Sequence, residues 1–263
     1  MTYNSAGAID SCLKTLDGFE VLVVDNASVD DTVAIVRKHP WVNVIISATN
    51  RGFAAGVNMG LQHFAGRDVL LLNPDVRTER SAIESLVRAL DERPSAGVVA
   101  PMLLYPDGDP QESARSFKSW SSVLARRTRW GQTKWGRRAL DHHLISARCT
   151  EPTAVDWVIG AAMLVRAGAV QEVGGMDERF FLYEEDLDWC ARMWAGGWEV
   201  VYDPRVRMFH DYARESSVWW DLRRRATRAH WRSLFRLAMK YPAQFFLSRP
   251  LRSPPRSPSG AAR

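Results

Sequence analysis

The segment best suited to chemistry has four carboxylates among five consecutive residues. They are Glu184, Glu185, Asp186 and Asp188. Crowded carboxyl groups beside apolar side chains have raised pKa values, and such a carboxylate is suited to accept a proton as a general base. The alternative is a solvated acidic start of a helix, which the helix dipole favours. Aromatic and apolar residues fill positions 180–183, so full solvation is unfavourable and we favour the catalytic interpretation.

Another carboxylate, Asp75, closes the motif Leu-Asn-Pro-Asp at residues 72–75, directly after an apolar run. Proline fixes the turn. A hard divalent cation that bridges a diphosphate needs only one or two protein carboxylates, because phosphate oxygens and water complete its coordination shell. The alternative is a plain Asn-Pro-Asp turn. His210 follows another apolar run, and this lone histidine matters only if the fold brings it to Asp75.

Two polar segments nearer the start of the chain also follow apolar runs. Asp25, with Asn26 and Ser28 behind it, could bond a nucleobase or ribose edge, although by itself the pattern favours a strand end before a helix cap. The glycines of residues 50–60 permit close backbone approach, and Arg51 could face a diphosphate. A glycine-rich helix packed on a sheet explains that segment equally well.

Positioning these side chains requires strands that end beside them. The pattern predicts strands at 21–24, 42–46, 69–72 and 97–100, alternating with helices at 30–39, 54–64 and 78–92. Short apolar runs that alternate with helices indicate a parallel sheet buried on both faces, with ligands beyond the carboxyl ends of its strands. Asp25, Asn50 and Asp75 all lie where a predicted strand has just ended.

The alternation stops at residues 106–150, a basic stretch that contains Trp120, Trp130 and Trp135. Further elements are predicted as strands at 155–165 and 199–202, a helix at 184–195 and a long helix from 217 to about 239. Apolar positions 231, 234, 235 and 238 of the last helix are expected to share one face, with arginines opposite. The Pro-, Ser- and Arg-rich tail is expected to be disordered.

Composition and charge narrow the class of protein. Of the 263 residues, 46% are hydrophobic and 25% charged, which is typical of a globular protein. No apolar run approaches the roughly 18–20 residues of a membrane span. Three widely spaced cysteines indicate a reducing cytoplasm. Residues 113–148 hold nine basic side chains against one acidic, and residues 212–263 hold twelve against two. Acidic blocks alternate with them, which argues against a nucleic-acid partner, whereas their tryptophans fit an anionic membrane surface.

Taken together, these segments resemble the family 2 glycosyltransferases, specifically their bacterial rhamnosyltransferase-like branch. The matching segments follow the family's order across residues 2–216. They are residues 2–5, 24–28 with Asp30, 50–53 with Asn58 and Gly60, 72–75, 160–163, 174–181, 185–186 with Asp188 and Arg192, and His210. Each is weak alone, but the ordered set is specific. The resemblance implies an α/β fold, the A-type nucleotide-sugar glycosyltransferase fold with a Rossmann-like mixed sheet.

The resemblance also implies transfer of a sugar from a nucleoside diphosphate with inversion at the anomeric carbon. The branch points to L-rhamnose from dTDP-rhamnose and to a polyprenyl-diphosphate-linked or other cell-envelope glycan acceptor. Asp186 matches the general base, and Asp75 and His210 match the ligands of a Mg²⁺ or Mn²⁺ ion. The implied nucleotide-sugar-binding residues are Thr2, Tyr3, Asn4, Asp25, Asn26, Ser28, Arg51, Gly52, Asn58 and Asn73. The implied acceptor-side residues are Trp157, Gly160, Glu185, Asp188 and Arg192.

The start of the sequence departs from the family. Family members place an apolar strand immediately before Thr-Tyr-Asn, and here only Met1 precedes that motif. We expect either that Met1 is an internal methionine of a longer reading frame or that the chain is truncated. Loss of a central strand would expose backbone groups of its neighbours. This departure favours a nucleotide-sugar-binding protein without turnover, whereas the complete set of Asp75, Asp186 and His210 favours an active enzyme.

The expected organisation is a catalytic domain at 1–216, a basic amphipathic helix at 217–247 and a disordered tail at 248–263. Within the catalytic domain we expect a nucleotide-binding half at 1–105, a basic insertion at 106–150 and an acceptor-side half at 151–216. The basic, tryptophan-bearing blocks favour a cytoplasmic enzyme that docks on the inner face of the plasma membrane, where a lipid acceptor lies. A solvated arginine-rich helix packed on the domain is an equally good interpretation.

Overall fold

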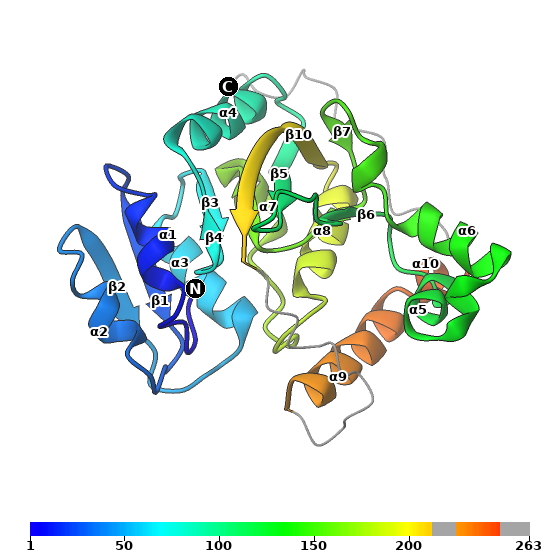
Figure 1. Ribbon diagram of the computed structural model, residues 1–263, viewed down its shortest axis with the longest axis horizontal. Coiled ribbons are helices and arrows are strands. Elements are labelled where there is room, and N and C mark those ends of the chain that lie inside the picture. Colours follow the sequence, from blue (N-terminus) through cyan, green and yellow to red (C-terminus); the bar gives the residue numbers. More distant parts are fainter. Residues whose placement is uncertain (212–224, 248–263) are drawn as a thin grey trace.

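A computed structural model describes residues 1–211 and 225–247 of the chain (Figure 1). Its largest sheet has the strand order β3-β9-β5-β10-β4, with β7 paired to β10. The strands are β3 (Val69–Leu72), β4 (Val76–Arg77), β5 (Ala96–Leu104), β7 (Thr153–Ala154), β9 (Ala162–Val165) and β10 (Glu199–His210). β10 runs parallel to β5, whereas β9 runs antiparallel to β3 and β5. The sheet is therefore mixed, as predicted for the fold class.

Two smaller sheets flank it. β1 (Val21–Asp25) pairs in parallel with β2 (Val42–Ile46), and β6 (Ala114–Arg115) pairs antiparallel with β8 (Trp157–Val158). The prediction that the strands at 21–24, 42–46, 69–72 and 97–100 form one parallel sheet is therefore wrong. β1 and β2 form a sheet of their own, and β9 inserts between β3 and β5 from much later in the chain. Apolar runs report burial but not strand direction or neighbours, which explains the error.

Four helices match the predicted positions with shifts of a few residues at their ends: α2 (Thr32–Val36), α3 (Phe53–His63), α4 (Arg80–Asp91) and α8 (Glu185–Ala195). Two further helices, α1 (Ile9–Lys14) and α7 (Ala167–Val173), were not predicted. α4 buries Ile83, Leu86 and Leu90, which share one face at helical spacing. α8 is buried along nearly its whole length, so the carboxylates at its start have no open solvent behind them.

The C-terminal region packs on this core through α9 (Arg225–Lys240) and α10 (Pro242–Leu247). Leu234, Leu237 and Ala238 of α9 join the largest buried cluster, together with Leu187 of α8. The expected apolar face was partly wrong: Phe235 is exposed and Leu237 is buried, because the contacting stripe runs 234, 237, 238. The expected helical residues 217–224 and the tail at 248–263 lie outside the described residues.

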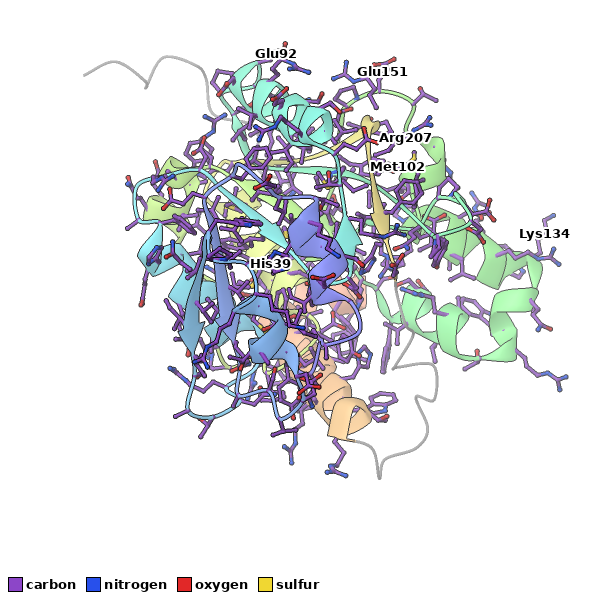
Figure 2. The ribbon with its side chains drawn as sticks, turned by 60° about the vertical axis from the view of Figure 1, so that its left-hand side comes forward. His39, Glu92, Met102, Lys134, Glu151 and Arg207 are labelled. Atoms are coloured by element: carbon purple, nitrogen blue, oxygen red, sulfur yellow. The ribbon has the colours of Figure 1, made fainter. Side chains whose placement is uncertain are left out.

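The basic insertion is mostly helical, with α5 (Trp120–Arg127), η1 (Arg129–Gln132), α6 (Lys134–His143) and η2 (Ser146–Arg148). Ser119 caps α5 through a hydrogen-bonded box with Ser122, and Thr133 caps α6. These helices form an arm beside α9 and α10, and Lys134 lies at its outer end (Figures 1 and 2). Within the described ranges, no helix is long and apolar enough to cross a membrane.

Candidate active site

The predicted general base lies at the strained start of α8. Tyr183 and Glu184 have φ angles of 66° and 71°, in the left-handed region that costs non-glycine residues about 1–3 kcal/mol each. The turn directs Asp186 into a cavity, where its carboxylate accepts hydrogen bonds from the backbone N–H of Gly160 (3.0 Å) and of Leu187 (2.8 Å). Strain of this kind persists only where the surrounding structure fixes it, and here it fixes the orientation of one carboxylate.

Burial and neighbouring carboxylates raise the pKa values of both Asp186 and Glu185. Burial raises the pKa of Asp186, and the charge of Glu184 raises it further, against the opposing effect of the Gly160 N–H. Burial and the charge of Asp186 raise the pKa of Glu185 well above its usual range. Glu185 is also buried, and among the described residues its Oε2 atom makes no hydrogen bond. Of these two residues, Glu185 is therefore the one that is protonated. Asp186 accepts hydrogen bonds from two backbone N–H groups, which stabilise its ionised form.

Glu184 has a different partner. It forms a buried ion pair with Lys118, which reaches it from the basic insertion 66 residues earlier in the chain. Burial lowers the pKa of Lys118, and Glu184 opposes that shift. Lys118 was not among the predicted site residues, because no local pattern links a lysine before α5 to the start of α8. The insertion thus contributes directly to the carboxylate cluster.

The two predicted metal ligands come together through strand pairing. β4 lies antiparallel to the end of β10, with Val76 opposite His210, and this places Asp75 beside the imidazole. The His210 Nε2 atom lies 3.4 Å from Asp75 Oδ1. Asp75 Oδ1 is buried, and no described residue donates it a hydrogen bond. Sequence reasoning predicted both residues, but only the fold shows that they meet.

Gln111, which sequence reasoning missed, fixes the tautomer of His210. Its Nε2 amide group donates to the carbonyls of His210 (2.7 Å) and Leu104 (3.3 Å), so its Oε1 atom must accept from His210 Nδ1 (2.9 Å). In the neutral imidazole Nδ1 then carries the hydrogen, and Nε2 presents a lone pair toward Asp75. Two acceptor atoms that face each other in this way suit a cation between them. The nearby sequence signal is the proline-rich turn at 106–110, which leads into Gln111.

The predicted nucleotide-binding residues near the start of the chain converge on Asp25. Its carboxylate is buried and accepts hydrogen bonds from the Thr2 hydroxyl (3.1 Å) and from the Ser28 hydroxyl (2.6 Å) and backbone N–H (2.9 Å). Asn4 joins the same loop, since its backbone N–H donates to the Ser28 hydroxyl and its side chain accepts from the Val29 N–H. Tyr3 lies between them in sequence and is exposed.

Asn26 and Gly52 tie this loop to the segment after β2. The Asn26 side chain donates to Asn50 and to the Gly52 carbonyl, and accepts from the Arg51 N–H. Gly52 has φ = 93°, and a Cβ atom there would lie 2.3 Å from the Phe181 carbonyl oxygen. Only glycine fits this close approach. The segment before α8 therefore packs directly against the loop after β2.

Arg51 and Asn58 face another direction. Arg51 pairs with Glu178 (2.8 Å) at the surface, and Asn58 binds the backbone of Met176 and the carboxylate of Glu178. Asn58 also lines a separate cavity of about 360 Å³. Asn58 therefore joins α3, and Arg51 the loop before α3, to the loop before α8. Their roles toward a nucleotide sugar remain predictions.

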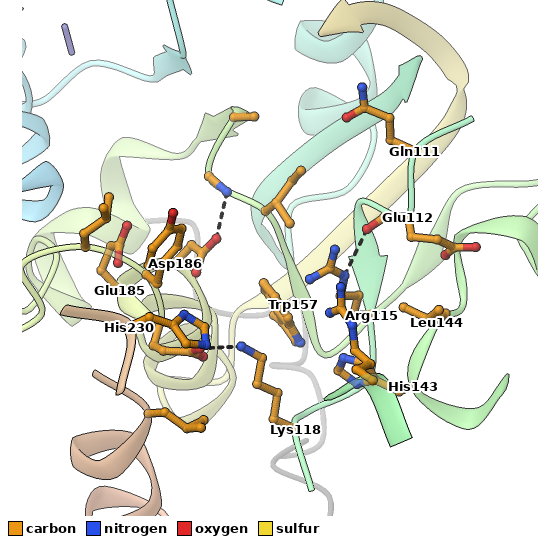
Figure 3. A pocket seen from close by; sticks show the side chains of 18 of the residues that line it. Gln111, Glu112, Arg115, Lys118, His143, Leu144, Trp157, Glu185, Asp186 and His230 are labelled. Carbon is orange, nitrogen blue, oxygen red and sulfur yellow. Dashed lines mark hydrogen bonds and ion pairs between the residues drawn. The ribbon is translucent and has the colours of Figure 1, made fainter. Parts of the chain in front are cut away.

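A cavity of about 730 Å³ collects most of the other predicted residues (Figure 3). Asn73, Trp157, Gly160, Glu185, Asp186 and His210 line it. Asp188 and Arg192 lie elsewhere, in an ion-pair network behind α8. Asp188 is fully buried and binds Arg192 (3.0 Å), Lys240 (2.6 Å) and the Tyr241 hydroxyl (2.9 Å). This network fastens α9 to α8, so the structure gives both residues a structural environment.

Comparison with known proteins agrees with this arrangement. The model of the family "Glycosyl transferase family 2" matches residues 1–149. An N-acetylglucosaminyl-diphospho-decaprenol L-rhamnosyltransferase of Mycobacterium tuberculosis is 32% identical over 223 residues, which cover 78% of this chain and 70% of that protein. The mixed sheet is that of the A-type glycosyltransferase fold. The chain belongs to glycosyltransferase family 2, which confirms the predicted resemblance.

Solved structures show the same fold at low sequence identity. The mannosyltransferase PcManGT of Pyrobaculum calidifontis, in complex with GDP-Man and Mn²⁺, aligns with a TM-score of 0.55 and 20% identity, over 81% of this chain and 56% of that one. GalNAc-T7 with UDP, GalNAc and Mn²⁺ aligns with a TM-score of 0.60 and 16% identity, over 84% and 41%. This chain thus spans about half the length of these solved chains.

Proposed function

We propose that the protein transfers a sugar from a nucleoside diphosphate to a hydroxyl of a polyprenyl-diphosphate-linked glycan, with inversion at the anomeric carbon. L-Rhamnose from dTDP-rhamnose is the proposed donor. The observation that carries the proposal is one cavity that contains both Asp186 and the His210 end of the Asp75–His210 pair. The name of the mycobacterial relative, which specifies L-rhamnose and a diphospho-decaprenol acceptor, supports the choice of donor and acceptor.

Asp186 accepts the proton of the acceptor hydroxyl. Two backbone N–H groups hold its carboxylate in one orientation, and its raised pKa makes it a stronger base than an exposed aspartate. Phe53, Trp157 and Ile159 line the same cavity and limit access of water, which would otherwise compete as acceptor. A single displacement of this kind needs no nucleophilic side chain, and it inverts the anomeric carbon.

Asp75 and His210 fit a divalent cation. A buried carboxylate oxygen without a hydrogen-bond donor faces an imidazole nitrogen whose lone pair Gln111 directs toward it. Among the residues that the structure describes, no cluster of three or more potential ligands occurs, so the donor diphosphate and water would supply the remaining ligands. When bound, Mg²⁺ or Mn²⁺ stabilises the negative charge of the departing diphosphate. The Mn²⁺ named with both structural relatives supports this assignment.

The loops around Asp25 form the proposed nucleotide end of the site. Thr2 and Ser28 hold the Asp25 carboxylate, and Asn26 holds the loop that contains Gly52. An anchored, buried carboxylate can accept a hydrogen bond from a base or ribose edge without prior rearrangement. Asn73 belongs to the same proposal, since its backbone N–H binds the Ala161 carbonyl beside the cavity.

Mass spectrometry of the reaction products tests this function. The full chain is incubated with Mg²⁺, dTDP- and UDP-sugars and a short-chain prenyl-diphosphate-GlcNAc acceptor. We expect product from dTDP-rhamnose, no product with Asp75→Ala, and unchanged product with Asp91→Asn, which alters an exposed carboxylate at the end of α4. Equal turnover by Asp75→Ala would contradict its metal role. Nucleotide binding without transfer by the wild-type protein would favour a binding module.

The arm of insertion helices, together with the adjoining α10, is the proposed membrane-facing surface. Its exposed side chains include Trp120, Leu124, Trp130, Trp135 and Phe246, and basic residues lie among them, such as Lys134 at the outer end (Figure 2). Tryptophan and basic residues together suit the headgroup region of an anionic bilayer. Such docking would bring a lipid-linked acceptor to the cavity.

Vesicle co-sedimentation tests the membrane contact. We expect the protein to bind vesicles that contain phosphatidylglycerol, to release at high salt, and to bind several-fold more weakly after Trp130→Ser and Trp135→Ser together. Phe209→Ser serves as the control, because Phe209 is exposed on β10 rather than on the arm. Binding that neither salt nor the tryptophan changes reduce would contradict the proposal.

A further inference from the structure

The cavity has a second charged wall that neither the base nor the metal pair explains. Arg115, Lys118 and Arg126 line it, together with the buried His143. Figure 3 shows Arg115, Lys118 and His143 gathered around Trp157. The Arg115 guanidinium lies 5.1 Å and the Lys118 ammonium 5.4 Å from the indole centroid, and the His143 ring centroid lies 6.4 Å away. Arg115, Lys118 and Arg126 all belong to the basic insertion.

The pKa of His143 shows the effect of these cations. Burial, followed by the charges of Arg115, Lys118 and Arg126, lowers the pKa of His143 to about 2. The imidazole is therefore neutral, with one N–H donor and one acceptor nitrogen. Only 1% of the residue is exposed, and neither ring nitrogen forms a well-aligned hydrogen bond with the described residues, although the Ser116 backbone opposes the fall in pKa as a weak acceptor. A buried N–H group held this weakly suits a ligand that accepts a hydrogen bond.

Three cations line this wall, and the acidic residues Glu112 and Glu184 lie beside them. Lys118 is paired with Glu184, but Arg115 donates through Nε to the neutral backbone carbonyl of Glu112. The Glu112 side chain also lines the cavity, and in Figure 3 its carboxylate points away from Arg115. The charges of Arg115, Lys118 and Arg126 all act on His143, so this wall is cationic beside the acidic start of α8. Guanidinium groups suit phosphate oxygens in particular, because their planar fork donates to two oxygens at once.

We propose that Arg115, Arg126 and His143, with Lys118 at their border, bind the diphosphate of the acceptor. This inference rests on the proposed function, in which the acceptor is a lipid-linked diphosphate. It separates two anions within one cavity: the donor diphosphate at Asp75 and His210, and the acceptor diphosphate on the insertion. The carboxylates of α8 repel the acceptor anion, so the cationic wall sets its position and leaves the first sugar to reach Asp186.

Binding of geranyl diphosphate tests the site without any transfer reaction. The full chain is titrated by calorimetry in EDTA, which removes metal from the donor end. We expect Arg115→Gln with Arg126→Gln to weaken binding by about tenfold or more, since each hydrogen bond to a charged group contributes at least that factor. Arg138→Gln, an exposed arginine of α6 that does not line the cavity, is expected to bind like the wild type. Equal affinity of all three proteins overturns the proposal.

Two further arms identify which diphosphate the wall binds. With Mg²⁺ present, we expect dTDP affinity to be the same in the double variant and the wild type, and an equal loss for dTDP assigns the wall to the donor and overturns the proposal. In transfer assays, we expect kcat/KM to fall for the prenyl-diphosphate-GlcNAc acceptor but not for octyl-GlcNAc, which lacks a diphosphate. Equal losses on both acceptors also overturn it. If dTDP-rhamnose is not the donor, the geranyl diphosphate result is unchanged, so failure of the proposed function can be told apart from failure of this inference.

Discussion

Asp25 and Asp186 are both carboxylates fixed by short hydrogen bonds, but their surroundings differ. Asp25 is held by neutral donors close in sequence or on the adjacent bridge, Ser28 and Thr2. Asp186 is held by two backbone N–H groups and lies beside Glu184 and Glu185. The first region is a polar loop network, whereas the second is a crowded acidic turn balanced by a lysine from a distant insertion.

The two environments suit different roles, hydrogen bonding to a nucleotide and proton transfer. A carboxylate surrounded by neutral donors is a stable acceptor, and it suits a hydrogen-bonding role toward a nucleotide. A carboxylate crowded by other carboxylates has a raised pKa, which suits proton transfer. The cost appears in the backbone, where Tyr183 and Glu184 adopt left-handed conformations to build the second region.

The largest expected effect comes from removing the proposed base, Asp186. Asp186→Asn keeps the shape of the side chain but cannot accept the acceptor proton, so kcat should fall by about 10²–10⁴-fold. Affinity for dTDP should be unchanged, because Asp25 and its neighbours are intact. Steady-state kinetics and calorimetry measure the two quantities. Near-normal kcat in a folded protein would remove Asp186 from the mechanism.

The network behind α8 should affect stability rather than turnover. Asp188→Asn leaves Arg192 and Lys240 without their buried carboxylate, and breaking such a buried pair costs about 3–5 kcal/mol in the free energy of unfolding. Urea unfolding measures that loss. The kcat of the folded fraction should stay close to wild type, since Asp188 does not line the cavity. A large fall in kcat at full folding would instead place Asp188 in the acceptor site.

A further prediction concerns Gln111 and its effect on metal affinity through His210. Gln111→Leu removes the acceptor that orients His210 Nδ1–H, and loss of such a supporting hydrogen bond lowers metal affinity by about 10–100-fold. Gln111→Glu keeps an acceptor and should retain more of the affinity. Activity as a function of Mn²⁺ concentration, together with direct Mn²⁺ titration, measures both. Identical metal affinity in all three proteins would show that Gln111 only packs the strand ends.

The smallest expected effect is a displaced pH profile. Asp186 must be ionised to act, so kcat/KM should fall as the pH is lowered through its pKa, which lies above the ordinary value of 3.8. Glu184→Gln removes a negative neighbour and should move that acid limb to lower pH. The raised pKa values of Asp186 and Glu185 also mean that the folded state binds these protons more tightly, so their contribution to stability is lost as the pH rises. An acid limb that stays in place in Glu184→Gln would contradict the assigned cause.

Local pattern predicted much of the fold. The amphipathic spacing of α4 and the apolar runs of β1, β3 and β5 gave elements near their observed positions. Strand neighbours were not predictable, because β9 is apolar on both faces and its sequence carries no information on direction. The face of α9 was misassigned at Phe235, since one residue of rotation on a helix exchanges a buried position for an exposed one.

The sequence alone determined the types of chemical group, the order of the family's motifs and the basic character of the insertion. Tertiary structure decided which of these groups meet. Strand pairing places Asp75 beside His210, and Gln111 sets the tautomer between them. The insertion places Lys118 against Glu184, whereas Asp188 binds Arg192 and Lys240. A sequence fixes spacing along one element, but contacts between distant elements depend on how their buried surfaces pack.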